Sequence, residues 1–153
     1  MDWFIKAFIR ASLVWFTVGI LLGLAMAIHP AWVVYRPAHA HMNVVGFITM
    51  MLFGVGYQLL PRLFGHALRS RALAIAHWWL ANLGLLAMVI GFMLAPHFGA
   101  QSAPVTATGG VLFAAGAFCF VFNLWRTFDA ADARHRAPGD AQQSPRTLPT
   151  LDG

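Results

Sequence analysis

The sequence predicts an all-α membrane protein, a bundle of four transmembrane helices followed by a disordered C-terminal tail. Of its 153 residues, 59% are hydrophobic and only 10% are charged, whereas soluble domains carry about 25% charged residues. Four apolar stretches are each long enough, at about 1.5 Å per residue, to cross a hydrocarbon core about 30 Å thick. Helix-breaking residues separate these stretches, so we expect one crossing from each.

The four predicted helices cover residues 7–28, 38–60, 72–95 and 105–128. The first apolar run is longer than the roughly 7–15 residues of a signal-peptide core, so we expect it to be retained as a helix. Prolines and charged turns divide the chain between the runs: His29-Pro30, Arg36-Pro37, Pro61-Arg62, Arg69-Ser70-Arg71, Pro96 and Pro104.

The composition changes after Phe128 to Asp, Ala, Arg, Gln, Pro and Thr, with no apolar periodicity. Such a segment cannot bury enough apolar surface to fold by itself. Residues 1–128 are therefore predicted to form the transmembrane domain, and residues 129–153 to form a disordered cytoplasmic tail.

The basic residues predict the orientation in the membrane. Arg36 is the one cation on one side of the predicted bundle, and the other nine fall on the opposite side. Because cytoplasmic loops carry the excess of Lys and Arg, both termini are predicted to be cytoplasmic, in a bacterial-type inner (plasma) membrane. The basic surplus is thus explained by topology, and we expect lipid contact and no nucleic-acid partner.

Seven histidines are unusual in so apolar a chain. His29, His39, His41 and His97 fall at the outer ends of the predicted helices. His77 falls about one turn inside the third helix from the cytoplasmic side, while His66 and His135 lie in a loop and the tail. An ionisable residue inside a membrane segment is a functional-site hypothesis, and histidine is a common haem ligand.

A b-type haem with two imidazole ligands needs histidines at similar depth on different helices, and His41 and His97 meet this condition. His39 and His41 are two residues apart, about 200° around a helix, so they cannot both face one iron. Arg36 could pair with the haem propionates. A histidine near a helix end is, equally, often an interfacial side chain, and His77 could simply form a hydrogen bond between helices.

Two other features leave alternatives open. Methionines accompany the histidines, so His39, His41 and Met42 could handle copper, although methionine is also routine apolar filling. Gly19 and Gly23 form a GxxxG motif, which permits close helix approach inside one bundle or in a dimer. No acidic residue lies between Asp2 and Asp129, so a carboxylate proton relay in the membrane is excluded.

The second predicted helix carries a family resemblance. Its residues Arg36-Pro37-Ala38-His39-Ala40-His41-Met42-Asn43, with the glycine-containing run 46–56 and Leu60-Pro61-Arg62, resemble the second helix of subunit I in the haem-copper oxidase superfamily, above all in its nitric oxide reductase and C-family oxidase branches. The third helix, at residues 76–84, looks like the third helix of small membrane proteins related to that subunit. The resemblance covers residues 7–95.

The resemblance implies a haem ligand on the second helix, because that helix supplies an axial histidine near the outer surface in the large enzymes. An R-P-x-H alignment would select His39, and an H-x-N alignment would select His41. We prefer His41, because Asn43 and the glycine run then align with the same helix of the family. The second ligand would come from His97, from His77 or from another subunit.

The sequence also departs from the superfamily, since it has neither a His-His pair nor an HxxxY motif. We therefore expect no oxygen or nitric oxide reduction by this chain alone. The predicted function is a haem b protein for electron transfer or gas sensing, as a homo-oligomer or beside respiratory-complex subunits. The alternatives are a cofactor-free accessory or assembly subunit and a copper-handling membrane protein.

Overall fold

A computed structural model of the chain describes residues 2–136, and these residues form helices joined by short connections, with no strand among them. The elements follow in the order α1 (Trp3–Ile28), η1 (Pro30–Tyr35), α2 (Arg36–His41), η2 (Met42–Thr49), α3 (Met50–Leu63), α4 (Arg71–Phe98), η3 (Gly99–Ser102) and α5 (Ala103–Arg136). Here η1 and η3 are 3₁₀-helices and η2 is a π-helix, so α2, η2 and α3 make one continuous helical rod.

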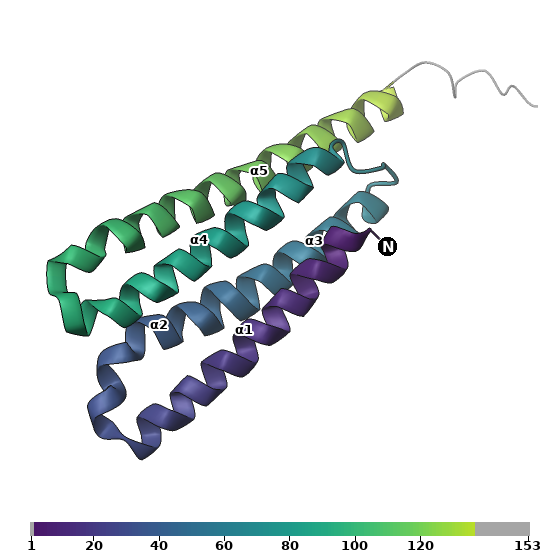
Figure 1. Cartoon of the computed structure of the whole chain (residues 1–153). Helices are drawn as coiled ribbons and strands as arrows, with labels where there is room; N and C mark the ends of the chain where they lie inside the picture. The colour runs from purple at the N-terminus through teal and green to yellow at the C-terminus, as the bar shows by residue number, and fades with distance from the viewer. Residues whose placement is uncertain (1, 137–153) are drawn as a thin grey trace, which may run out of the picture.

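Three joined helical stretches, rather than the four predicted, are long and apolar enough to cross a membrane: Trp3–Ile28, Pro30–Leu63 and Arg71–Ala133. The difference arises because α4, η3 and α5 continue without a break in helical structure. That third stretch reverses direction at η3, and α4 and α5 lie side by side along their lengths (Figure 1).

The structure also moves the predicted helix ends. Pro61 lies inside α3 and Pro96 inside α4, each within the last turn. A proline lacks the N–H that would bond to the carbonyl four residues back. Only that one hydrogen bond is lost, so a helix can continue past a proline for a few residues. Helix α5 continues past Phe128 to Arg136, so the first residues of the predicted tail are helical. The rest of that tail, residues 137–153, lies outside the described residues.

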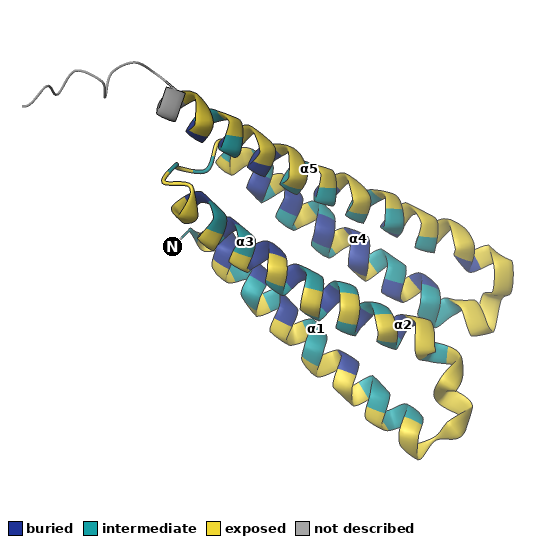
Figure 2. Cartoon of the chain, turned by 180° about the vertical axis from the view of Figure 1, so that it is seen from behind, coloured by how far each residue is buried: buried dark blue, intermediate teal, exposed yellow. Residues whose placement is uncertain are grey.

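The helices pack as two antiparallel pairs, α1 with η2 and α3, and α4 with α5 (Figure 1). The second pair is in backbone contact: a Cβ atom added to Gly84 would lie 2.5 Å from the backbone nitrogen of Phe113. Figure 2 shows that the buried residues of α1, α3 and α4 face inward, while much of α5 is exposed. In a membrane protein this apolar outer surface is the surface that contacts lipid.

Helix α5 holds the connection between α3 and α4 through side chains that bind its backbone. The Asn123 side chain accepts a hydrogen bond from the Ser70 backbone nitrogen (3.0 Å) and donates one to the Ser70 carbonyl (2.7 Å). The Thr127 hydroxyl accepts from the Arg69 backbone nitrogen at 3.0 Å. These contacts satisfy backbone groups before α4 begins, where Ser70 caps the helix by accepting from Leu73.

Candidate functional site

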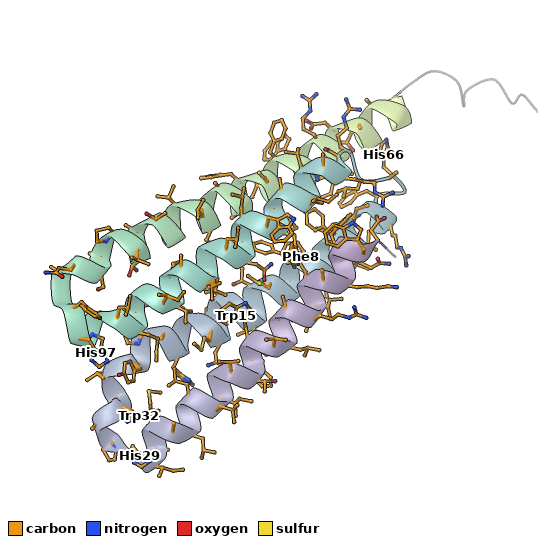
Figure 3. The ribbon with its side chains drawn as sticks, viewed as in Figure 1. Phe8, Trp15, His29, Trp32, His66 and His97 are labelled. Atoms are coloured by element: carbon orange, nitrogen blue, oxygen red, sulfur yellow. The ribbon has the colours of Figure 1, made fainter. Side chains whose placement is uncertain are left out.

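The histidines lie at the two ends of the bundle, as the sequence predicts. Figure 3 shows His29 and His97 at the end formed by η1 and η3, together with Trp32, and His66 at the opposite end. The first of these ends, which also carries α2, is called the outer end below. It contains five of the six residues predicted to form the site: Arg36, His39, His41, Asn43 and His97.

His39 packs against α1. Its Nδ1 lies 2.9 Å from the carbonyl oxygen of Gly19, so Nδ1–H donates to that carbonyl. A Cβ atom added to Gly23 would lie 2.7 Å from Cε1 of the His39 ring, which shows how closely the ring covers that glycine. The two glycines of the GxxxG motif therefore admit a side chain from α2 within one bundle.

Asn43 completes this packing one turn further along. Its Nδ2 donates to the His39 carbonyl at 2.8 Å and lies 3.3 Å from Nδ1 of the His39 ring. A Cβ atom added to Gly19 would meet the Asn43 amide at 2.7 Å. Asn43 thus supports the His39 ring from within the same rod, and the polar contact with α1 is the hydrogen bond from His39 to the Gly19 carbonyl. Hydrogen bonds of this kind between helices stabilise a membrane bundle.

His41 faces the other way, toward α4, as its separation of about 200° from His39 predicts. Its ring centroid lies 4.5 Å from that of Phe92, with the two planes tilted by 41°. Nδ1 lies 2.8 Å from the Pro37 carbonyl and donates to it, so the proton is on Nδ1. Nε2 has no hydrogen-bond partner among the described residues. An imidazole whose Nδ1–H is bound to a carbonyl presents Nε2 as the ligand atom.

His97 and Arg36 lie at the same end of the bundle as His41, but neither contacts it among the described residues. Nε2 of His97 lies 2.9 Å from the hydroxyl of Tyr35, so one ring nitrogen is already hydrogen-bonded. No hydrogen bond or ring contact connects His97 to His41 in the described part of the chain. Both His97 and Arg36 are exposed, so each is free to change position or to meet a group from outside the chain.

His77 lies at the other end of the bundle and is completely buried. Its Nδ1 lies 3.1 Å from the Tyr57 hydroxyl, and Nε2 is enclosed with no partner. Four aromatic rings surround it, with centroids 4.4 to 5.7 Å from the imidazole: Phe8, Phe53, Tyr57 and Phe120. These rings fill the space that a ligand would need, so His77 acts as a packed core residue here.

The structure does not bring the predicted ligand pair together in a single chain, because no contact joins His41 to His97 among the described residues. His41 is the predicted ligand with a free Nε2, whereas His39 is turned to α1 and His77 is enclosed. Within the part of the chain that the structure describes, no group of three His, Cys, Asp or Glu side chains could hold a metal ion. The copper set is also divided, since His39 and His41 face different helices and Met42 is buried.

Sequence reasoning missed several partners of these histidines. The sequence pattern does not point to Tyr35 or Phe92, and it presents Pro37 only as a helix breaker and as part of the resembling motif, although the His41–Pro37 spacing of four residues is about one helical turn. The π-helix Met42–Thr49, which begins directly after His41, was missed as well. Such wide turns often occur at functional sites, and here the turn changes which residues of the rod face inward.

Comparisons with known proteins support the resemblance to subunit I of the haem-copper oxidases. The chain is 25% identical over 118 residues to the cbb3-type cytochrome c oxidase subunit CcoN1 of Stutzerimonas stutzeri, covering 61% of this chain and 25% of that protein. It is 31% identical over 114 residues to cytochrome c oxidase subunit 1 of Rhodobacter capsulatus, covering 58% and 21% of the two chains.

A shorter match reaches 38% identity over 63 residues with cytochrome c oxidase subunit 1 of Thermus thermophilus, covering 40% of this chain and 56% of the other. No family model matches the sequence. The chain thus spans about a quarter or less of the length of the first two relatives. The fold and these similarities describe a helical membrane protein that resembles segments of a respiratory oxidase subunit.

Proposed function

We propose that the chain is a haem b-binding membrane protein in which His41 supplies one axial ligand and a second chain supplies the other. The second chain would be another copy of this protein or a respiratory-complex subunit. The observation that carries this proposal is the hydrogen bond from Nδ1 of His41 to the Pro37 carbonyl, which leaves Nε2 unpaired at the outer end. Bound haem would supply one-electron chemistry, and Arg36 would pair with its propionates.

The proposed membrane arrangement follows from the charges and the helix pairs. Because α4 and α5 lie antiparallel, their joined stretch would cross twice, giving four crossings in all. Nine of the ten Lys and Arg residues would then be on the cytoplasmic side, with both termini, in a bacterial-type inner membrane. His41 would lie on the opposite side, near the outer surface.

Two further candidate functions have specific support. A haem held by His41 alone would leave one axial position open, which suits gas sensing better than electron transfer. A cofactor-free accessory or assembly subunit is favoured by the packing of His39 and His77, which have partners inside the chain. Copper handling has less support, because the described residues hold no group of three donors. In none of these does the chain reduce oxygen by itself.

The test is a pyridine haemochrome assay and an absorption spectrum on protein purified in mild detergent. We expect a b-type Soret band in the wild-type protein that is lost in His41→Ala, while His39→Ala retains the band. A low-spin spectrum would indicate two ligands and electron transfer, and a high-spin spectrum would indicate one ligand and gas sensing. Correctly folded protein without haem would refute the proposal. Bound copper without haem would favour the copper-handling function instead.

The second ligand can be tested separately with His97→Ala. If another chain supplies the ligand, this change leaves the low-spin spectrum intact, and dilution to monomers converts it to high-spin. If His97 turns away from Tyr35 to bind the iron, His97→Ala alone gives the high-spin form. A spectrum that survives both His41→Ala and His97→Ala would place the haem elsewhere.

A further inference from the structure

A groove between α1 and α4 lies at the end of the bundle opposite His41. It has a volume of about 420 Å³ and is lined by Trp3, Lys6, Arg10, the small residues Ala7 and Ala11, and by Val14 and Trp78. The groove combines two cations with aromatic and small apolar side chains. The proposed haem site does not use this groove.

The two cations of the groove lie one turn apart on α1. Lys6 and Arg10 are spaced by four residues, so they face the same side of the helix and repel each other. Both are exposed. Among the side chains that the structure describes, the one ion pair joins Arg71 to Asp2 at 2.7 Å, so neither Lys6 nor Arg10 has an acidic partner there. An anion between them would relieve this repulsion.

Apart from Lys6 and Arg10, the side chains that line the groove are apolar or aromatic. Ala7 and Ala11 leave space between the helices because their side chains are small. Trp3 and Trp78 stand at the end of the groove, with ring centroids 5.9 Å apart and planes at 70°. Tryptophan prefers the level of the lipid headgroups. The floor from Trp3 to Val14 extends about 16 Å along the axis, which is half of a hydrocarbon core about 30 Å thick.

We propose that this groove binds one anionic phospholipid, with its phosphodiester between Lys6 and Arg10 and an acyl chain along Ala7, Ala11 and Val14. A soluble anion would need no apolar floor, and a zwitterionic lipid carries an ammonium group that the two cations repel. Basic pockets between helices at the membrane surface bind such headgroups. Placement in the cytoplasmic leaflet rests on the proposed orientation, but binding itself does not depend on haem.

The experiment measures which lipids remain bound to the purified full chain. The protein is reconstituted in equal amounts of phosphatidylglycerol and phosphatidylethanolamine with matched acyl chains, extracted in mild detergent, and examined by native mass spectrometry. We expect one phosphatidylglycerol to be retained in preference to phosphatidylethanolamine. Lys6→Gln with Arg10→Gln should reduce this preference about tenfold, because each cation near a membrane surface contributes to anion attraction.

Matched controls separate this site from general charge attraction. The exchange Lys6→Arg with Arg10→Lys keeps both charges and should keep the preference, as should Arg69→Gln, which removes an exposed cation outside the groove. An equal loss in Arg69→Gln, or an unchanged preference in the double Gln variant, would overturn the proposal. Displacement of the lipid by inorganic phosphate would show that the site takes a free anion. Haem content is measured in the same samples. Loss of the lipid preference without loss of haem, or the reverse, shows that the two proposals succeed or fail separately.

Discussion

The two ends of the bundle place histidine in opposite surroundings. At one end His77 is fully buried among four aromatic rings, and the hydroxyl of one of them, Tyr57, is hydrogen-bonded to Nδ1. At the outer end His41 is half-buried, and its Nε2 is left without a partner. Location inside the membrane span is therefore not what makes a histidine available to a cofactor. Availability depends on which ring nitrogen the backbone occupies and on whether neighbouring side chains fill the space in front of the other.

The largest expected effect is the loss of the buried ring. His77→Ala would leave a cavity among Phe8, Phe53 and Phe120, and we expect it to lower the free energy of unfolding by about 3 kcal/mol. His97→Ala is the matched change at the outer end, where the exposed ring has little to lose, and should stay within about 0.5 kcal/mol. Unfolding in detergent, followed by near-ultraviolet circular dichroism, measures both values.

Equal losses of unfolding free energy in His77→Ala and His97→Ala would contradict the difference between the two ends of the bundle. They would mean either that the aromatic enclosure of His77 is loosely packed or that His97 contributes to stability through more than its bond to Tyr35. A large effect of His97→Ala that appears only when haem is bound would instead assign His97 to the haem.

A smaller effect is expected where side chains of α5 bind the inner connection. Asn123→Ala would remove both hydrogen bonds to the Ser70 backbone, and we expect a loss of about 1–2 kcal/mol. The outer connection η1 has no buried residue and should tolerate change better. Val34→Ala, at an exposed position there, is the matched substitution and should leave stability nearly unchanged.

Limited proteolysis checks the same point locally. In Asn123→Ala, cleavage near Arg69 and Arg71 by trypsin should accelerate, because that segment loses its backbone partners. Unchanged cleavage there, with normal global stability, would mean that the Thr127 hydroxyl alone holds the connection.

These contacts also show what the sequence could and could not predict. The apolar runs predicted an all-helical chain, which the described residues confirm, although three joined stretches rather than four are long and apolar enough to cross a membrane. The GxxxG motif permits close approach at Gly19 and Gly23, where two side chains of the second helical stretch pack. Its partners, His39 and Asn43, lie about 20 residues away, and no local pattern identifies them. The aromatic enclosure of His77 was likewise hidden, because Phe8, Phe53 and Phe120 come from three other helices.

The predicted helix ends were wrong for a different reason. The sequence pattern predicts that helices stop before Pro61 and Pro96, whereas each proline lies in the last turn of its helix, where it removes only one backbone hydrogen bond. The composition predicts a tail after Phe128, whereas α5 continues to Arg136 and Ala131 in this segment is buried. Composition describes the average environment of a segment, whereas a single inward-facing residue can extend a helix by a turn.

The smallest expected change in stability concerns the two tyrosine–histidine pairs, Tyr57 with His77 and Tyr35 with His97. Tyr57→Phe removes the enclosed hydrogen bond to His77, and we expect a loss of about 0.6 kcal/mol, the usual value between membrane helices. Tyr35→Phe removes the 2.9 Å contact with His97, but water can replace that partner at an exposed site, so stability should be unchanged. The spectrum gives the more informative readout. Because Tyr35→Phe releases Nε2 of His97, it should increase the low-spin haem fraction if His97 is the second ligand, and leave it unchanged if that ligand comes from another chain.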